Sequence, residues 1–170
     1  MKRWGLAFFA FLFCLAVSAQ QLEHGSFLPL QGEKRVNFAI EFLSVHGMTE
    51  DEFNEYERDW YKDKPEIVVK FLTYANQELS SVLRLGNYPT AKFTVKAIVV
   101  DINVKGDFLC DLIMLDSSAN EIAKISDING RGGVFGTKLS LIKDGAEHTG
   151  KIVGQILANF IRKTRTRKSR

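Results

Sequence analysis

The stretch that decides the fold is residues 91–128, AKFTVKAIVVDINVKGDFLCDLIMLDSSANEIAKISDI. It holds three runs of apolar and β-branched residues joined by two short polar turns: 91–102, 108–115 and 121–128, with turns at 103–106 and 116–120. Connections this short pair neighbouring strands antiparallel, so the sequence predicts a three-stranded meander. Its first strand is apolar on both faces from Ala97 to Val100, which is typical of a strand at the centre of a sheet.

Upstream of the meander, the chain shows a strand pattern followed by helical patterns. Residues 36–42 alternate between apolar and polar side chains, which predicts a strand. The T-x-x-E motif at residues 49–52 is a capping box and predicts a helix over about 50–63. Pro65 disfavours helix at the residue before it, so we expect a second helix over about 66–83.

Downstream of the meander, a glycine-rich link leads into the longest helical pattern, residues 138–163. Ala146, Gly150 and Gly154 recur at every fourth position of this helix, and such a smooth ridge predicts close packing on the sheet. The predicted order is β-α-α-β-β-β-α. We therefore expect an α+β fold: a two-layer sandwich with a mostly antiparallel four-stranded sheet and its helices on one face.

The first 19 residues have the pattern of a secretory signal peptide. Lys2 and Arg3 precede an apolar run of about a dozen residues, which is shorter than the ~20 residues of a membrane span. Val17 and Ala19 place compact side chains at the −3 and −1 positions of a cleavage site. We expect an exported protein of the periplasm or cell envelope, with the leader cleaved before Gln20.

Two alternatives for the leader stay open. It could be retained as an N-terminal anchor, or Cys14 could be lipidated, although the bulky Phe13 before it does not suit a lipoprotein processing site. After the leader we expect a leading loop or short edge strand over residues 20–35, one α/β domain over 36–163 and a basic tail over 164–170.

Cys110 is the one cysteine outside the leader, so the mature chain can form no intrachain disulfide. Stability must then come from packing. Because Cys110 lies within an apolar strand pattern, we expect a buried structural thiol rather than a nucleophile.

The link before the last helix is a candidate anion-binding loop. Four glycines and an arginine make up the candidate: Gly130, Arg131, Gly132, Gly133 and Gly136. Their N–H groups could converge at the positive end of the helix dipole. The glycine spacing fits neither a P-loop nor a dinucleotide fingerprint. The alternative is a strand-to-helix crossover that needs glycines at positive φ.

The C-terminal end of the chain is a second candidate surface. It carries six basic residues and no acid: Arg162, Lys163, Arg165, Arg167, Lys168 and Arg170. The body between leader and tail is mildly acidic, although the whole chain has a formal net charge of +3. The tail could dock on anionic lipid or acidic polysaccharide, or be a solvated terminus. We expect no nucleic-acid partner, because nucleic acid is the anion least accessible to an exported protein.

No motif predicts catalysis, a metal site or a cofactor. His24, His46 and His148 are far apart and lack zinc-ligand spacing, and no G-x-S-x-G serine motif is present. We interpret the acidic run at 50–59 as a solvated helix face, because cations follow it and acids near a helix start offset the dipole. If Asp111 and Asp127 point to the side of the sheet that no helix covers, that side is polar.

Four segments of the chain resemble uncharacterised exported proteins of the Bacteroidota. They are G-D-F-L at 106–109, D-S-S-A-N-E-I-A at 116–123, I-N-G-R-G-G-V-F-G at 128–136 and K-I-V-G-Q-I-L-A-N-F-I at 151–161. The chain is also similar in plan to small envelope domains of the DUF4410, TolB N-terminal and CsgG types. This resemblance implies an α/β sandwich in the cell envelope with an assembly or accessory role. It supplies no catalytic residues.

These observations favour an exported cell-envelope accessory or binding protein without catalytic activity, which uses an exposed sheet face or edge to meet an envelope partner. One alternative is an envelope-surface-associating domain that binds an anionic ligand through the basic tail or the glycine-rich loop. An enzyme of unknown class stays open as well, because clusters formed in space do not show in a sequence.

Overall fold

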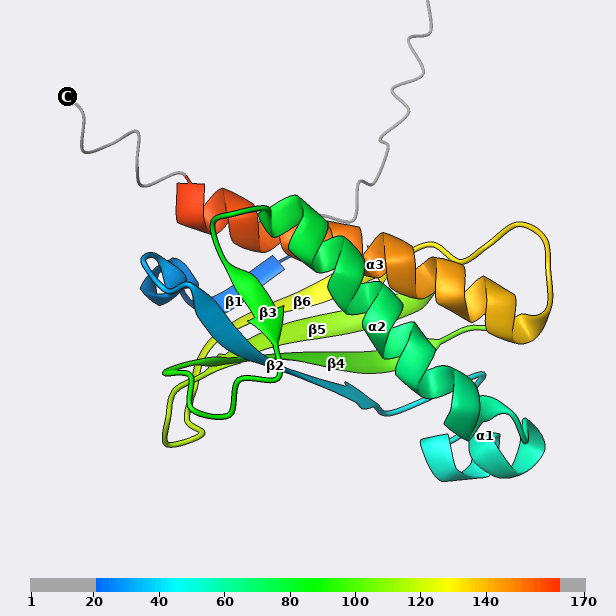
Figure 1. Ribbon diagram of the computed structural model, residues 1–170. Helices are drawn as coiled ribbons and strands as arrows, with labels where there is room; N and C mark the ends of the chain where they lie inside the picture. Colours follow the sequence, from blue (N-terminus) through cyan, green and yellow to red (C-terminus); the bar gives the residue numbers. More distant parts are fainter. Residues whose placement is uncertain (1–20, 163–170) are drawn as a thin grey trace, which may run out of the picture.

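Two helices cover one face of a six-stranded sheet in the computed structural model, which describes residues 21–162 (Figure 1). The strand order across the sheet is β1-β6-β5-β4-β2-β3. The elements, in chain order, are β1 (Gln21–Gly25), η1 (Leu28–Leu30), β2 (Arg35–Phe42), α1 (Glu50–Tyr56), α2 (Trp60–Leu79), β3 (Arg84–Gly86), β4 (Thr94–Ile102), β5 (Phe108–Leu115), β6 (Glu121–Gly130) and α3 (Lys138–Arg162).

The meander expected from residues 91–128 is confirmed. β4 pairs antiparallel with β5, and β5 pairs antiparallel with β6, across the two short turns. Both β4 and β5 have neighbours on each side, as their apolar runs indicate. Helix-facing side chains of the three strands include Val95, Leu112 and Ile125, all of which are buried.

The expected four-stranded, mostly antiparallel sheet is corrected to a six-stranded mixed sheet. β2 runs parallel to β4 and to β3, because the chain returns from β2 through α1 and α2 and enters the sheet again from the same end. β1 comes from the segment expected to be a leading loop or edge strand, and it pairs antiparallel with β6. β1 is exposed at every position and β3 has three residues, so neither leaves a clear pattern in the sequence.

The helix boundaries also differ from those expected. The capping box of Thr49 and Glu52 is present, but α1 ends at Tyr56 and α2 runs from Trp60 through Pro65 to Leu79. The first helix ends earlier than expected because Trp60 is buried between β2 and α1. Its ring lies edge-on to the rings of Phe42 and Phe53. Pro65 is the sixth residue of α2 and lies inside the helix, where it lacks the N–H that would bond to the carbonyl of Tyr61, so the expected break before it is wrong.

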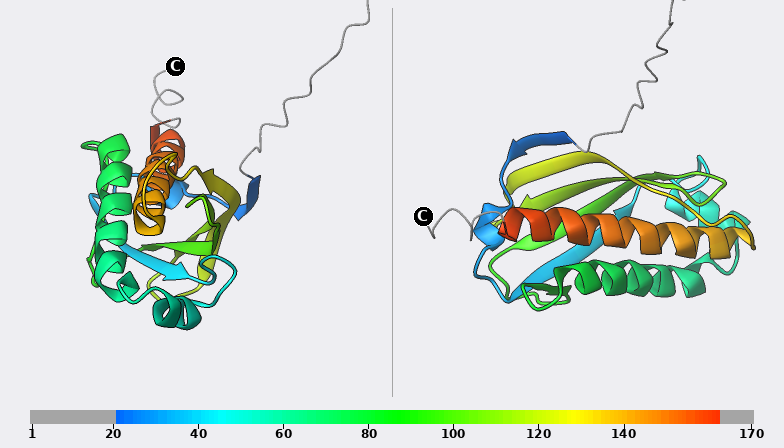
Figure 2. Two further views of the ribbon diagram at one scale, coloured as in Figure 1. Left: turned by 90° about the vertical axis from the view of Figure 1, so that its right-hand side faces the viewer. Right: turned by 90° about the horizontal axis from the view of Figure 1, so that it is seen from above.

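Of the three α-helices within residues 21–162, two lie on the face of the sheet. α2 and α3 run side by side over it, whereas α1 sits beyond the end of the sheet (Figure 2). The largest fully buried side chains fill the space between these layers and under α1: Trp60, Phe27, Phe53, Phe71, Phe108, Leu30, Ile67, Leu79, Leu85, Ile102, Leu112 and Met114.

The glycine ridge of α3 faces α2 rather than the sheet, which corrects the expectation. A Cβ atom at Gly150 would overlap the carbonyl oxygen of Phe71, and a Cβ atom at Gly154 would overlap that of Ala75. α3 also approaches the sheet closely, because Gly145 lies against the backbone of Gly106. The two helices therefore touch backbone to backbone.

We expect Gly154→Ala to lower the free energy of unfolding by about 2–3 kcal/mol, because the added methyl group has no room against α2. The sign is diagnostic, since a glycine-to-alanine change in an open helix interior stabilises by about 1 kcal/mol. Urea denaturation measures the change. Gln155→Ala, one position away on the exposed side of α3, is the matched control and should be nearly neutral.

Cys110 is fully buried, as expected, and burial raises the pKa of its thiol to about 12. A chain with Cys14→Ser should therefore leave Cys110 unmodified by a thiol reagent at pH 8 and give full reaction once unfolded in denaturant. Adding Ser117→Cys, at an exposed turn position, provides a thiol that should react at once. Rapid reaction of Cys110 in the native chain would contradict a buried structural thiol.

Candidate functional site

Three connecting segments gather at the end of the sheet toward which β2 and β4 run (Figure 1). They are the β4–β5 turn at 103–107, the glycine-rich link at 131–137 and α1, and we call this region the loop end. Gly132 lies directly against the backbone of Lys105 and Gly106, so link and turn are in contact. The Nζ of Lys138 donates a 2.9 Å hydrogen bond to Tyr56 Oη, which joins the start of α3 to the end of α1.

Asp107 fastens the link to the turn. The backbone N–H of Gly132 donates to Asp107 Oδ1 at 2.7 Å, and the side-chain amide of Asn103 donates to Asp107 Oδ2 at 2.9 Å. The pKa of Asp107 is lowered, first by the bond from Asn103 and then by the bond from Gly132. The half-buried carboxylate of Asp107 thus lies where the link would hold a bound anion.

The N–H groups of the predicted anion loop are largely used within the protein. The N–H of Arg131 donates to His148 Nδ1 at 2.8 Å, and that of Gly133 donates to the carbonyl of Leu141 at 3.3 Å. Thr137 Oγ1 accepts from the N–H of Ser140 in the first turn of α3. Anion binding by this loop stays a prediction, with the exposed Arg131 side chain as its most accessible donor.

The glycines of the link have distinct structural roles. Gly130 ends β6 and is buried, where a Cβ atom would overlap the hydroxyl of Thr149. Gly132 allows the close approach to the β4–β5 turn. Gly136 has a φ of 134°, so within the link it is the glycine that provides the positive φ of a strand-to-helix crossover.

The link presents two residues that the sequence-based prediction passed over. Val134 is 83% exposed and Phe135 is 89% exposed, the highest values among the large apolar side chains of residues 21–162. Val104, in the adjoining turn, is 69% exposed. The signal in the sequence was a valine and a phenylalanine set between glycines in a link with no other large apolar residue. We call Val104, Val134 and Phe135 the apolar tip.

The charges around the apolar tip are mainly positive. The turn at 103–107 and the segment 131–138 hold three cations, Lys105, Arg131 and Lys138, and one acid, Asp107, which is already engaged. The neighbouring α1 is acidic, and two of its three first-turn acids have internal partners. Glu52 accepts from Thr49 in the capping box, and Glu50 accepts from Trp60 Nε1 at 3.1 Å.

Arg162, the one described residue of the basic tail candidates, lies far from the loop end. Arg162 closes α3, at the opposite terminus of this 25-residue helix from the link, and lines a small hollow with Lys34 and Ser81. Its guanidinium donates to the carbonyl oxygen of Glu78 at 3.4 Å. The remaining tail residues of the prediction, and the leader with Cys14 and Gln20, lie outside the described residues: Lys163, Arg165, Arg167, Lys168 and Arg170.

The face of the sheet opposite the helices carries ion pairs. Lys124 Nζ lies 3.3 Å from Asp111 Oδ2 and 3.1 Å from Glu23 Oε2, and Lys96 Nζ lies 2.5 Å from Glu41 Oε2. The N–H of Asp127 donates to Asp111 Oδ1, so the two aspartates are neighbours. The expected polar face is therefore present.

Nothing in residues 21–162 gathers three or more potential metal ligands of the His, Cys, Asp and Glu types. Over the same residues, the search for a helix long and apolar enough to cross a membrane finds none. The three histidines stay apart: His24 pairs with Glu121, His148 accepts from the link, and His46 packs edge-on against the ring of Phe53.

No protein-family model and no curated protein matches the chain. Among solved structures, it is similar to two PelC dodecamers from Paraburkholderia phytofirmans, one of them a variant. The variant is 15% identical with a TM-score of 0.45, over 81% of this chain and 96% of that chain. The other is 14% identical with a TM-score of 0.46, over 81% of this chain and 95% of that chain. Similarity at this level carries no argument about function or assembly.

We expect Asp107→Asn to loosen the loop end. The free energy of unfolding at pH 7 should fall by about 1–2 kcal/mol, and hydrogen exchange at the Gly132 amide should accelerate. Because the folded-state pKa of Asp107 lies below its ordinary value of 3.8, its contribution is complete above that value and is lost as the pH falls through the folded-state pKa. The difference between wild type and variant should therefore shrink at low pH.

Asp116→Asn is the matched control, because Asp116 also has a lowered pKa but accepts bonds within its own turn at the other end of the sheet. It should leave exchange at Gly132 unchanged. Equal protection of Gly132 in wild type and Asp107→Asn would show that the link is held by other contacts.

Proposed function

We propose that this chain is a non-enzymatic accessory protein of the cell envelope that attaches reversibly to an anionic lipid surface through its loop end. The observation that carries the proposal is the exposure of Val134 and Phe135 at a structured loop tip. Export rests on the sequence of residues 1–19, and the family resemblance stays a prediction. The loop end deepens the predicted alternative in which the glycine-rich loop meets an anionic surface.

Exposed apolar side chains that gather at one place are typical of an interaction site, whereas single ones are common on protein surfaces. Burial of a valine or phenylalanine side chain contributes roughly 1.5–3 kcal/mol. The apolar tip as a whole is therefore comparable to a single acyl chain, which gives only marginal and reversible membrane binding. Attachment of useful strength needs a second contribution.

The cations beside the tip supply that second contribution. Each lysine or arginine near an anionic lipid surface adds about 1 kcal/mol, and the effect weakens as salt screens it. Lys105 is adjacent to Val104 in its turn, and Arg131 and Lys138 bracket the link. An apolar tip flanked by cations fits a surface whose interior is hydrocarbon and whose headgroups are anionic.

The loop end is also held in place for such a contact. The Asp107 bonds join the link to the β4–β5 turn, so Val104 is fixed relative to Val134 and Phe135. α3 continues from the link as one 25-residue helix packed on α2. Little conformational entropy remains to be lost when the tip enters a surface, which favours binding.

We expect Phe135→Ser to weaken binding to phosphatidylglycerol-containing vesicles by about tenfold or more, because the largest apolar group of the tip is lost. Val134→Ser should weaken it as well, by a smaller factor. Vesicle co-sedimentation of the exported, purified chain measures both changes. All variants share the same leader processing and basic tail, so differences between them report on the loop end.

Val69→Ser is the matched control, because Val69 is 62% exposed on α2, away from the loop end. It should bind vesicles like wild type. Vesicles of neutral lipid alone should bind weakly, and Lys105→Glu should reduce binding to anionic vesicles by a factor that falls at high salt. Equal vesicle binding of Phe135→Ser and Val69→Ser would overturn the proposed function.

A further inference from the structure

The two edges of the sheet differ in how well they are protected. β1 forms one edge and is blunted by an irregular register between Leu22 and His24 and by the ion pair of Glu23 with Lys124. On the other edge, β3 pairs only with residues 35–37 of β2. Within residues 21–162, no strand pairs with the outer side of β2 from Phe38 to Phe42.

The free part of β2 presents regular backbone groups. The N–H of Asn37 donates to the carbonyl of Phe93 and the N–H of Leu43 donates to that of Val99, both toward β4. Because donors alternate along a strand, the N–H groups of Phe38, Ile40 and Phe42 point to the outer edge. The β2–β4 register carries no bulge that would turn this edge away.

A partly apolar groove between α2 and β3 adjoins this edge at its Asn37 end. Phe38 and Ile40 are partly exposed although they point to the helices, because they lie at the margin of the sheet. Above them, the outer flank of α2 contributes Leu72 and the 62% exposed Val69. A hollow of about 480 Å³ lies between α2 and β3, and Leu72 and Tyr88 line it from the two sides.

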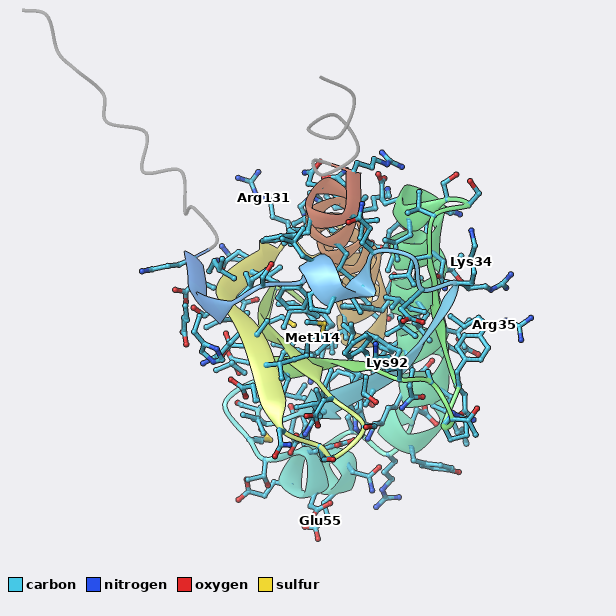
Figure 3. The ribbon with its side chains drawn as sticks, turned by 90° about the vertical axis from the view of Figure 1, so that its left-hand side faces the viewer. Lys34, Arg35, Glu55, Lys92, Met114 and Arg131 are labelled. Atoms are coloured by element: carbon cyan, nitrogen blue, oxygen red, sulfur yellow. The ribbon has the colours of Figure 1, made fainter. Side chains whose placement is uncertain are left out.

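Unbalanced positive charge marks one end of the groove. Arg35 on β2 and Arg84 on β3 are register partners, and like charges placed opposite each other destabilise a strand pair. Neither has an ion-pair partner among the described residues, and Arg35 lies over the Tyr88 ring at 5.5 Å. Lys34 and Arg35 extend outward side by side (Figure 3). A bound carboxylate would relieve this repulsion.

From these four observations we infer that the free edge of β2 accepts an extended segment of a partner protein as a further strand. Backbone hydrogen bonds to residues 38–42 hold the segment, and alternate apolar side chains enter the groove beside α2. An acidic residue of the segment lies against Arg35 and Arg84. The arginine pair lies at the opposite end of β2 from the loop end. The site uses other residues than the apolar tip and does not depend on the proposed lipid attachment.

The probe for this site is a short synthetic peptide of alternating valine and threonine that ends in two glutamates. We expect it to slow hydrogen exchange at the Ile40 and Phe42 amides, and to shift few NMR signals away from β2, β3 and α2. The same peptide ending in two lysines should bind more weakly. Equal binding of the two peptides, or protection elsewhere on the sheet, would overturn the inference.

Charge reversal tests the arginines without disturbing the core, because both side chains are exposed. Arg35→Glu and Arg84→Glu should each weaken the binding of the acidic peptide by about threefold to fivefold, as expected for an exposed ion pair. Both variants should bind the lysine peptide more tightly than wild type does. Lys105→Glu, at the loop end, is the matched control and should leave both affinities unchanged. If charge reversal leaves the affinities for both peptides unchanged, the inference about β2 is wrong. The proposed lipid attachment is not affected by that result, because vesicle binding depends on other residues.

Ile40→Pro tests the backbone contribution. It removes a donor from the outer edge alone, a position where strands tolerate proline, so the circular dichroism spectrum should stay native while the peptide no longer binds. Unchanged peptide affinity in a folded Ile40→Pro chain would overturn strand addition. If light scattering instead shows a dimer whose Ile40 amide is protected without peptide, the occupant is a second copy and the inference is wrong.

Discussion

The close contact between α2 and α3 is the constraint on which the rest of the structure depends. Gly150 and Gly154 remove the side chains that would hold the helices apart, so the backbone of α3 lies against the carbonyl groups of Phe71 and Ala75. Two helices spaced this closely fit together over one face of the sheet. No helix of residues 21–162 lies on the opposite face, which carries ion pairs instead.

The same helix places the loop end. Gly145 of α3 lies on the backbone of Gly106, and Gly132 of the link lies on the neighbouring Lys105. The β4–β5 turn is thus held from two sides, and Asp107 adds its hydrogen bond to Gly132. The exposed residues at this end belong to well-fixed segments, so their exposure is a property of the fold rather than of a loose loop.

The two proposed surfaces use different physical interactions and lie at different places. The loop end offers apolar side chains and cations to a lipid surface, where area and charge matter and backbone geometry does not. The β2 edge offers backbone donors and acceptors to an extended chain, where register matters and the charged residues select the partner. A chain with both surfaces could hold a partner protein at a lipid surface.

The sequence predicted local features well. The meander, the capping box of Thr49 and Glu52, and the burial of Cys110 each follow from a pattern within a few residues. The early end of α1 could not be predicted from such a local pattern, because it depends on the burial of Trp60 against Phe42, eighteen positions away. The glycine-rich link joins β6 to α3. The partners of its N–H groups were not visible in the sequence, because Asp107 and His148 reach them from other elements.

By itself, the sequence determined the fold class, the antiparallel meander and the identity of α3 as the longest helix, because periodicity and short turns are local properties of the chain. Tertiary structure alone decided the parallel placement of β2, the pairing of β1 with β6 and the partner of the glycine ridge. It also decided which apolar residues stay exposed, at the loop end and along β2. The physical reason is that burial and strand pairing depend on which distant segments arrive at the same place, and no local pattern encodes that.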